Sequence, residues 1–322
     1  MTDPVGSSVY PHARMRYAVT GAAGFIGSHL AEALAGGGHD VVGLDSFTDY
    51  YDPALKEENA AVLAAAGVDV LRVDLAEDTL DLVGFDGVFH LAGQPGVRSF
   101  GDVFDLYLRR NLLASARVFE AAARDGARVV FASSSSIYGA AERYPTPEET
   151  PPHPLSPYGI TKLGCEHLAA AYGRAFGLDC VVLRYFNAFG PRQRPDMAFT
   201  RIVHALAEGG SFELYGDGDQ SRGWTYVADV VDATVRAMAA GNGIYNVGGA
   251  LEASMNETIA LLEKLSGRTL EVHRHPAVPG DQRRTSADTD RIRSELGWEP
   301  RVSLEDGLAS QWSWASARVA GR

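Results

Sequence analysis

Tyr158 and Lys162 are four residues apart in a segment whose sequence predicts the start of a helix. Ser156 suits the N-cap and Pro157 the first helical position, so the two side chains fall on one helix face. A phenol with an ordinary pKa of about 10 is a weak base, but a neighbouring ammonium favours the phenolate and lowers that pKa. The pair therefore predicts a group that takes a proton from a hydroxyl, although an exposed Tyr and Lys would show the same spacing.

A run of four serines strengthens this interpretation. Ser133–Ser136 follows a predicted buried strand at 127–132. Side chains at the carboxyl ends of parallel strands line the crevice where α/β proteins bind ligands. A serine hydroxyl there could bond the substrate oxygen and complete a Ser–Tyr–Lys set.

The glycines Gly21, Gly24 and Gly27 follow a predicted strand at 17–20 and open a predicted helix. Glycine lets the backbone approach a pyrophosphate, and a helix N-terminus supplies N–H groups and positive potential. The spacing is G-x-x-G-x-x-G, which by itself is also common in tight strand–helix turns.

Acidic residues at the ends of the next two predicted strands support a dinucleotide site at the glycines. Asp45 lies where a carboxylate would bond ribose hydroxyls and repel a 2′-phosphate, which favours NAD over NADP. Asp74 and Leu75 would suit the adenine, although an ordinary aspartate at a strand end gives the same pattern.

Apolar segments of strand length alternate with helical patterns through the first 185 residues, which predicts βαβ units and a parallel sheet. We expect strands at 17–20, 41–44, 68–73, 87–91, 127–132 and 180–185. A predicted helix near 102–124 places these apolar residues on one face: Phe104, Leu108, Leu112, Ala116 and Phe119.

Three regions are expected. Residues 1–15 form a flexible leader, and 16–185 form an NAD-binding domain to which 225–250 returns. A smaller substrate lobe is built from 186–224 and 251–322.

Composition limits the class of protein. The chain has 322 residues, 46% hydrophobic and 22% charged, with a net charge of −12, which argues against a nucleic-acid partner. No apolar run approaches the roughly 20 residues of a membrane span, so no membrane partner is expected. Two cysteines give neither a disulfide framework nor a metal-ligand spacing. We therefore expect no metal, and a reducing cytoplasm as the location.

Several motifs taken together resemble the extended short-chain dehydrogenase/reductase superfamily, and within it the nucleotide-sugar epimerases. They are T-G-A-A-G-F-I-G at 20–27, the serine run before I-Y-G, P-Y-G-I-T-K at 157–162 and L-R-Y-F-N at 183–187. The stretches 43–53, 92–98 and 190–199 are similar to UDP-glucuronate 4-epimerases in particular. The resemblance covers about residues 16–300. It implies a Rossmann-type doubly wound parallel sheet with a smaller C-terminal α/β lobe, tightly bound NAD, a UDP-sugar substrate and a homodimer formed through the helices near 102–124 and 157–176.

The resemblance also implies roles for individual residues. The catalytic residues are Ser134, Tyr158 and Lys162. The residues that contact NAD are Gly21, Gly24, Phe25, Ile26, Gly27, Asp45, Asp74, Leu75, Leu91, Ala92, Gly93, Tyr158 and Lys162. The residues around the sugar nucleotide are Arg98, Ser134, Ser135, Ser136, Tyr158, Asn187, Arg192, Arg194, Arg222 and Arg284.

Relatives that share the first oxidation at C4 differ in the next step. Dehydratases and decarboxylases carry an acid where this chain has Ser135 and Ser136. Without that acid, the expected reaction is inversion at C4 through a transient 4-keto sugar that regenerates NAD. Serines and an arginine, Arg194 in preference to Arg192, fit a uronate carboxylate. The expected isomerisation is UDP-glucuronate to UDP-galacturonate.

Other functions remain open at this point. UDP-glucose 4-epimerase is the nearest alternative, and UDP-glucuronate decarboxylase is a weaker one. A net oxidoreductase would release NADH and need exchangeable cofactor. A non-catalytic NAD sensor on the same fold would be expected to lack Tyr158 or Lys162.

Overall fold

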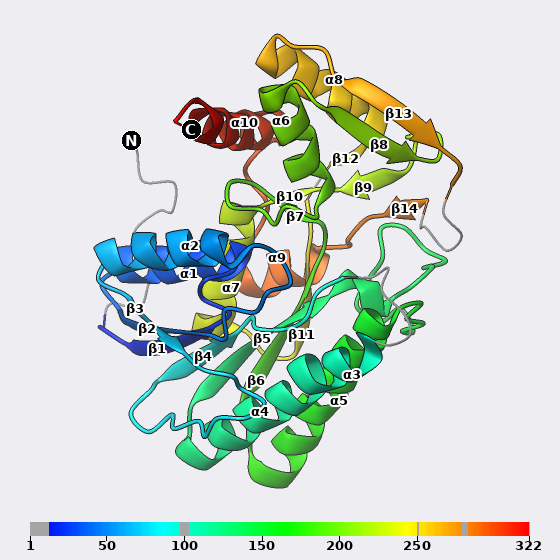
Figure 1. Ribbon diagram of the computed structural model, residues 1–322. Coiled ribbons are helices and arrows are strands. Elements are labelled where there is room, and N and C mark those ends of the chain that lie inside the picture. The colour runs from blue at the N-terminus through cyan, green and yellow to red at the C-terminus, as the bar shows by residue number, and fades with distance from the viewer. Residues whose placement is uncertain (1–12, 97–102, 250, 278–282, 322) are drawn as a thin grey trace.

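The computed structural model of the protein describes residues 13–96, 103–249, 251–277 and 283–321. A parallel sheet with helices on both faces lies below a smaller lobe that contains α6, α8 and α10 (Figure 1). Of the leader expected at 1–15, only residues 13–15 fall within these ranges.

The central sheet has seven parallel strands in the order β11-β6-β5-β4-β1-β2-β3. The strands are β1 (Arg16–Thr20), β2 (Asp40–Asp45), β3 (Asp69–Arg72), β4 (Gly87–His90), β5 (Arg128–Ser134), β6 (Cys180–Tyr185) and β11 (Ile244–Val247). The strand order reverses between β1 and β4, which opens a crevice at the carboxyl ends of these strands. This arrangement confirms the predicted fold class, a doubly wound parallel sheet with a smaller second lobe.

Two apolar layers cover the sheet. On one face, α1 (Phe25–Gly36), α7 (Val227–Ala240) and α9 (Asp290–Leu296) bury Leu30, Val231 and Ile292 against the strands. On the other face, α4 (Ala114–Asp125) and α5 (Pro157–Phe176) bury Phe119 and Cys165. No helix in the described ranges is long and apolar enough to cross a bilayer.

The sequence predicted one continuous apolar face for the helix near 102–124, and this prediction is wrong for the first half of the helix. The helix is divided into α3 (Phe104–Tyr107), a π-helical segment η2 (Leu108–Leu113) and α4. The π turn adds a residue and rotates the helix, so Tyr107 and Asn111 are buried instead. Phe104 and Leu108 remain 37% and 38% exposed.

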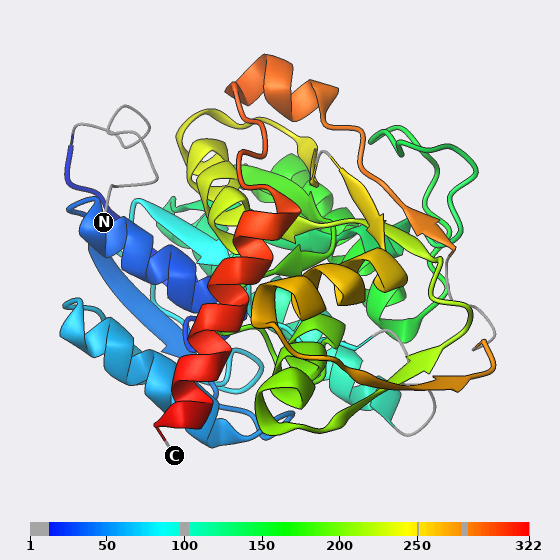
Figure 2. The same cartoon turned by 90° about the horizontal axis from the view of Figure 1, so that it is seen from above.

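The smaller lobe packs helices against short strands. Its helices are α6 (Ala198–Glu208), α8 (Met255–Ser266) and α10 (Leu304–Ala320), and its strands are β7 (Ala188–Phe189), β8 (Ser211–Tyr215), β9 (Ser221–Gly223), β10 (Thr225–Tyr226), β12 (Glu252–Ser254), β13 (Glu271–His275) and β14 (Arg284–Thr285). Phe199, Phe212 and Leu262 lie in its core. Seen from above in Figure 2, helix α10 runs at a steep angle to α1 and α2 (Pro53–Ala65). Arg318 of α10 forms an ion pair with Glu58 of α2.

A buried histidine joins the end of β1 to β4 and α4. The Thr20 hydroxyl accepts hydrogen bonds from the backbone N–H groups of Leu91 and Ala92, so its proton goes to Nδ1 of His90 (2.8 Å). Nε2–H of His90 then donates to the Ser115 hydroxyl (2.9 Å). This chain of bonds requires a neutral imidazole directly beneath the glycine loop.

We predict that His90 makes stability depend on pH. Burial, assisted by the Lys162 charge, lowers the pKa of His90 from 6.5 to about 3. An unfolded histidine binds a proton below about pH 6.5, while folded His90 does not, so the free energy of unfolding falls as pH drops from 6.5 towards 3. The expected loss from His90 is about 2 kcal/mol at pH 5.

Urea unfolding at pH 7 and pH 5 measures this effect. His90→Asn should lose less stability between the two pH values than the native chain, by about 2 kcal/mol. An equal loss in both proteins would show that His90 is protonated in the folded state.

Candidate active site

A cavity of about 1280 Å³ lies between the carboxyl ends of the strands and the smaller lobe. Pockets that hold one drug-sized ligand measure about 300–1,000 Å³, so this cavity has room for two ligands. All the sequence-predicted cofactor residues line it: Gly21, Gly24, Phe25, Ile26, Gly27, Asp45, Asp74, Leu75, Leu91, Ala92, Gly93, Tyr158 and Lys162.

The glycine loop is shaped for a close approach to an anion. Gly21 has a φ of +70°, and a Cβ there would lie 3.0 Å from the backbone nitrogen of Ala92. A Cβ on Gly27 would lie 2.1 Å from the carbonyl oxygen of Gly21. Gly24 is the N-cap of α1 and has no side chain to cap its first turn, so a bound pyrophosphate can meet the N–H groups there.

Asp45 is held at the edge of this loop. Its Oδ2 accepts a hydrogen bond from the N–H of Ala23 (3.1 Å), and its Oδ1 accepts one from Phe47 (2.8 Å). Lys56, which the sequence analysis missed, lines the cavity with its Nζ 3.8 Å from Asp45 and 3.0 Å from the Thr48 hydroxyl. A glycine cradle next to a fixed carboxylate fits the pyrophosphate and ribose of NAD.

The Tyr158–Lys162 pair is placed by the start of α5. The Ser156 hydroxyl caps the helix by accepting a hydrogen bond from Gly159 (3.1 Å). The buried Nζ of Lys162 donates to the carbonyl oxygen of Ala132 (2.8 Å) and lies 5.9 Å from the centroid of the Tyr158 ring. The ammonium is therefore fixed beside the phenol.

Asn111, in the π-helical segment, supports this wall of the cavity and was missed by the sequence analysis. Its Oδ1 accepts a hydrogen bond from the backbone of Gln94 (2.7 Å), and its Nδ2 donates to the Thr161 hydroxyl (3.0 Å). A Cβ on Gly93 would lie 2.9 Å from Asn111 and 3.4 Å from Lys162. No sequence motif marks a π turn, so spacing could not reveal this contact.

The four serines divide between the cavity and the core. Ser134–Ser136 lines the cavity, and the Ser134 and Ser136 hydroxyls are 3.1 Å apart. Ser133 also borders it, but its hydroxyl donates to Glu166, which is buried in an ion pair with Arg184 (2.8 Å). Ser134, the last residue of β5, is thus the first serine of the run whose hydroxyl is not bonded to this buried acid.

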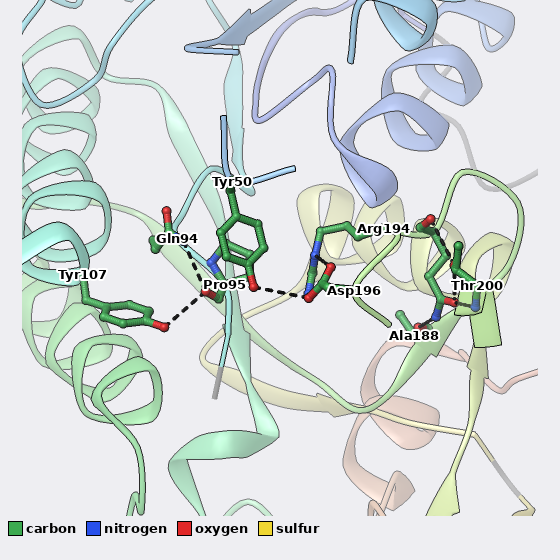
Figure 3. A network of polar contacts seen from close by, with 9 residues as sticks. Tyr50, Gln94, Pro95, Tyr107, Ala188, Arg194, Asp196 and Thr200 are labelled. Carbon is green, nitrogen blue, oxygen red and sulfur yellow. Dashed lines mark hydrogen bonds and ion pairs between the residues drawn. The ribbon is translucent and has the colours of Figure 1, made fainter. Parts of the chain in front are cut away.

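Asn187, Arg194 and Arg222, which the sequence analysis placed around the sugar nucleotide, line the cavity. Asn187 Nδ2 donates to the Thr285 hydroxyl (2.8 Å). Figure 3 shows Arg194 and Tyr50 converging on Asp196, which also lines the cavity. Tyr50 and Asp196 belong to the motif stretches 43–53 and 190–199, but their types alone did not indicate this contact.

Three expected arginines are not part of this group. Arg192 has a positive φ of 61° and forms an ion pair with Glu32 of α1 (2.7 Å), outside the main cavity. Arg284 pairs with Glu252 (2.7 Å) and also lies outside it. The structure therefore does not bring Arg192 and Arg284 into the cavity with the other predicted substrate residues. Arg98 lies outside the described residues.

The site can be compared with known proteins. The chain matches the family model described as the NAD dependent epimerase/dehydratase family over residues 17–248. A protein of Bacillus subtilis (strain 168), described as an uncharacterized UDP-glucose epimerase (YtcB), is 39% identical over 319 residues, which cover 95% of this chain and 100% of that protein. The UDP-glucose 4-epimerase of Mycolicibacterium smegmatis is 37% identical over 303 residues, which cover 92% and 96%.

A solved structure gives a third comparison. The crystal structure of UDP-glucuronic acid 4-epimerase from Bacillus cereus, in complex with UDP-glucuronic acid and NAD, is 38% identical, with a TM-score of 0.90. The match covers 94% of this chain and 100% of that chain. With its glycine loop, its Asp45 and its Tyr158–Lys162 pair, this chain belongs to the NAD dependent epimerase/dehydratase family.

Proposed function

We propose that this protein is an isomerase that inverts C4 of a UDP-hexuronate, converting UDP-glucuronate to UDP-galacturonate. One observation carries the proposal: a single cavity holds Tyr158 and Lys162 together with Ser134–Ser136 and Arg194. The first pair supplies proton chemistry at a sugar hydroxyl, and the second group supplies ligands for a carboxylate.

The side chains of the protein move the proton of the C4 hydroxyl. The chemistry that NAD supplies when bound is two-electron oxidation and reduction at that carbon. Tyr158 takes the C4 hydroxyl proton, and the Lys162 ammonium stabilises the phenolate that has to form. The Ser134 hydroxyl donates a hydrogen bond to the C4 oxygen. Rotation of the 4-keto sugar in the cavity presents its other face, and Tyr158 returns the proton to the same oxygen.

The acids of the cavity do not favour elimination of a C6 group. Among its described lining residues, the carboxylates are Asp45, Asp74, Asp196 and Glu213. Asp45 lies at the glycine loop, and Asp196 is paired with Arg194. The carboxylate adjoining the serine run is Glu166, which is held by Arg184. Positions 135 and 136 are serines, so neither supplies a carboxylate that could act as an acid or a base.

The C6 carboxylate needs to be held because a 4-keto uronate is a β-keto acid. Decarboxylation proceeds when the breaking C–C bond aligns with the carbonyl π-system. Arg194 and the Ser135 and Ser136 hydroxyls would fix the plane of the carboxylate away from that alignment. The second candidate is UDP-glucose 4-epimerase, which the Arg194–Asp196 ion pair favours because it leaves the arginine neutralised without a sugar carboxylate.

We also propose a homodimer. The apolar side chains Phe104, Leu108 and Leu113 are 37–43% exposed, and Ile160 of α5 is 50% exposed. Helices α3, α4 and α5 lie together on the outside of one sheet face (Figure 1). Burying these side chains against a second copy would remove an exposed apolar surface from water.

The proposed reaction is tested by adding UDP-glucuronate to the purified protein without added NAD and following the anomeric protons by NMR. UDP-galacturonate should form without release of CO₂. Tyr158→Phe should bind NAD and lose about 10²–10⁴-fold in kcat because the proton acceptor is gone. A pentose product, or near-native activity of the variant, would contradict the proposal.

Arg194→Ala tests the carboxylate contact. We expect kcat/KM for UDP-glucuronate to fall by about tenfold to a hundredfold, since a charge-assisted hydrogen bond contributes about 1.5–3 kcal/mol. The loss with UDP-glucose should be much smaller. Arg192→Ala, two residues away and outside the cavity, is the matched control. Equal losses with both substrates would mean that Arg194 binds the shared nucleotide.

Leu108→Glu combined with Ile160→Glu tests the dimer. Light scattering after gel filtration should show the native chain as a dimer and the double variant as a monomer, because two charges would enter the interface. Val83→Glu, at an apolar residue that is 70% exposed elsewhere, is the control. A monomeric native protein would refute the assignment of this face.

A further inference from the structure

The guanidinium that we assign to the sugar carboxylate already has a carboxylate partner. Arg194 donates to Asp196 through both Nε (2.9 Å) and Nη2 (3.0 Å). The Tyr50 hydroxyl donates to the same Asp196 (3.3 Å), and the Arg194 guanidinium lies 6.0 Å from the Tyr50 ring centroid. These contacts are visible in Figure 3. The positive charge of Arg194 is thus neutralised within the chain, at the wall of the cavity.

The loop that carries this pair is firmly attached to the lobe. The buried Gln193 accepts hydrogen bonds from Gln311 of α10 (3.0 Å) and from the N–H of Thr200 (3.2 Å). It also donates to the carbonyl oxygen of Ala188 (3.0 Å). Because the residue next to Arg194 is fixed by these bonds, the pair is held in place in the cavity.

The ion pair with Asp196 leaves the Nη1 side of the Arg194 guanidinium open to a ligand. Asp196 occupies the Nε–Nη2 edge, and within the described residues Nη1 has no protein acceptor. Burial works against the charged form of Arg194, but the hydrogen bond and charge of Asp196, with smaller contributions from Tyr50 and Tyr158, raise its pKa. Arg194 therefore stays charged at neutral pH, and the Tyr158 phenol lies within electrostatic reach of it.

We propose that Asp196 is a specificity-determining residue that sets the balance between neutral and anionic sugars. This inference rests on the proposed function. When the C6 group is a neutral hydroxymethyl, Asp196 keeps Arg194 paired, so no desolvated cation is left without a partner. When C6 is a carboxylate, it binds the Nη1–Nη2 end and is repelled by Asp196 across the guanidinium.

The consequence is a site that accepts both UDP-hexoses and UDP-hexuronates. A pocket built to pair one substrate group rejects the analogue that lacks it by about 10⁴–10⁵-fold, because its own polar groups are left unpaired. Asp196 removes that penalty for the neutral sugar. We expect the native holoenzyme to epimerise UDP-glucose with a kcat/KM within about a hundredfold of that for UDP-glucuronate. A larger preference for the uronate would overturn the inference, whatever the behaviour of any variant.

Asp196→Asn keeps the size of the side chain and removes its charge. The ratio of kcat/KM for UDP-glucuronate to that for UDP-glucose should rise by about tenfold, chiefly through KM, because repulsion of the uronate is lost and Arg194 is left unpaired with the neutral sugar. An unchanged or lower ratio would show that Asp196 only positions Arg194. The double variant Arg194→Met/Asp196→Asn, which lacks both charges, should give a ratio below the native value. A ratio at or above the native value would overturn the inference.

A matched control changes the partner of another arginine on the same loop. Glu32→Gln, on α1, removes the carboxylate that pairs with Arg192 outside the cavity, and it should leave the ratio unchanged. A similar rise in this control would assign the effect to the general charge of the loop and overturn the role of Asp196. Failure of the native protein to epimerise either sugar nucleotide would instead refute the proposed function, which separates the two outcomes.

Discussion

The site depends on the buried ammonium of Lys162, which has no carboxylate partner among the described residues. Lys162 is 4% exposed, and its protein contacts in the described part of the chain are the Ala132 carbonyl oxygen and the ring faces of Phe131 and Tyr158. A buried charge without a counter-charge is costly. The phenolate form of Tyr158 would supply that counter-charge, and it is the form that can accept a proton from a substrate hydroxyl.

The ion pair between Glu166 and Arg184 keeps the Glu166 carboxylate away from the Lys162 ammonium. Glu166 lies one turn beyond Lys162 on α5, where a carboxylate could neutralise the ammonium. Instead, two nitrogens of Arg184 bind it, and the Ser133 hydroxyl donates to it. Arg184 also donates to the Tyr138 hydroxyl (2.7 Å). Glu166 is therefore bonded within the core, where it links α5 to β5 through Ser133 and to β6 through Arg184.

The sequence predicted the parts of this arrangement that follow from local rules. The glycine loop, the Ser156 cap and the alternation of strands and helices each depend on a few adjacent residues. The π turn at Leu108–Leu113 could not be predicted because helical spacing assumes 3.6 residues per turn. Arg192 and Arg194 also looked equivalent in sequence. The positive φ of Arg192 and the burial of Gln193 direct them to different partners, and those features arise from packing against α1 and α10.

Lys162 and Arg194, two of the cations that line the cavity, differ in their partners, and this difference matches their proposed roles. No carboxylate in the part of the chain that the structure describes pairs with Lys162, so its charge can act on an anion that forms beside it. Arg194 is neutralised by Asp196, so it can hold an anionic substrate group without requiring one. An unpaired arginine at C6 would demand a uronate, whereas a paired lysine beside Tyr158 would weaken the base. The chemistry at C4 and the tolerance at C6 therefore both depend on where the chain places its own carboxylates.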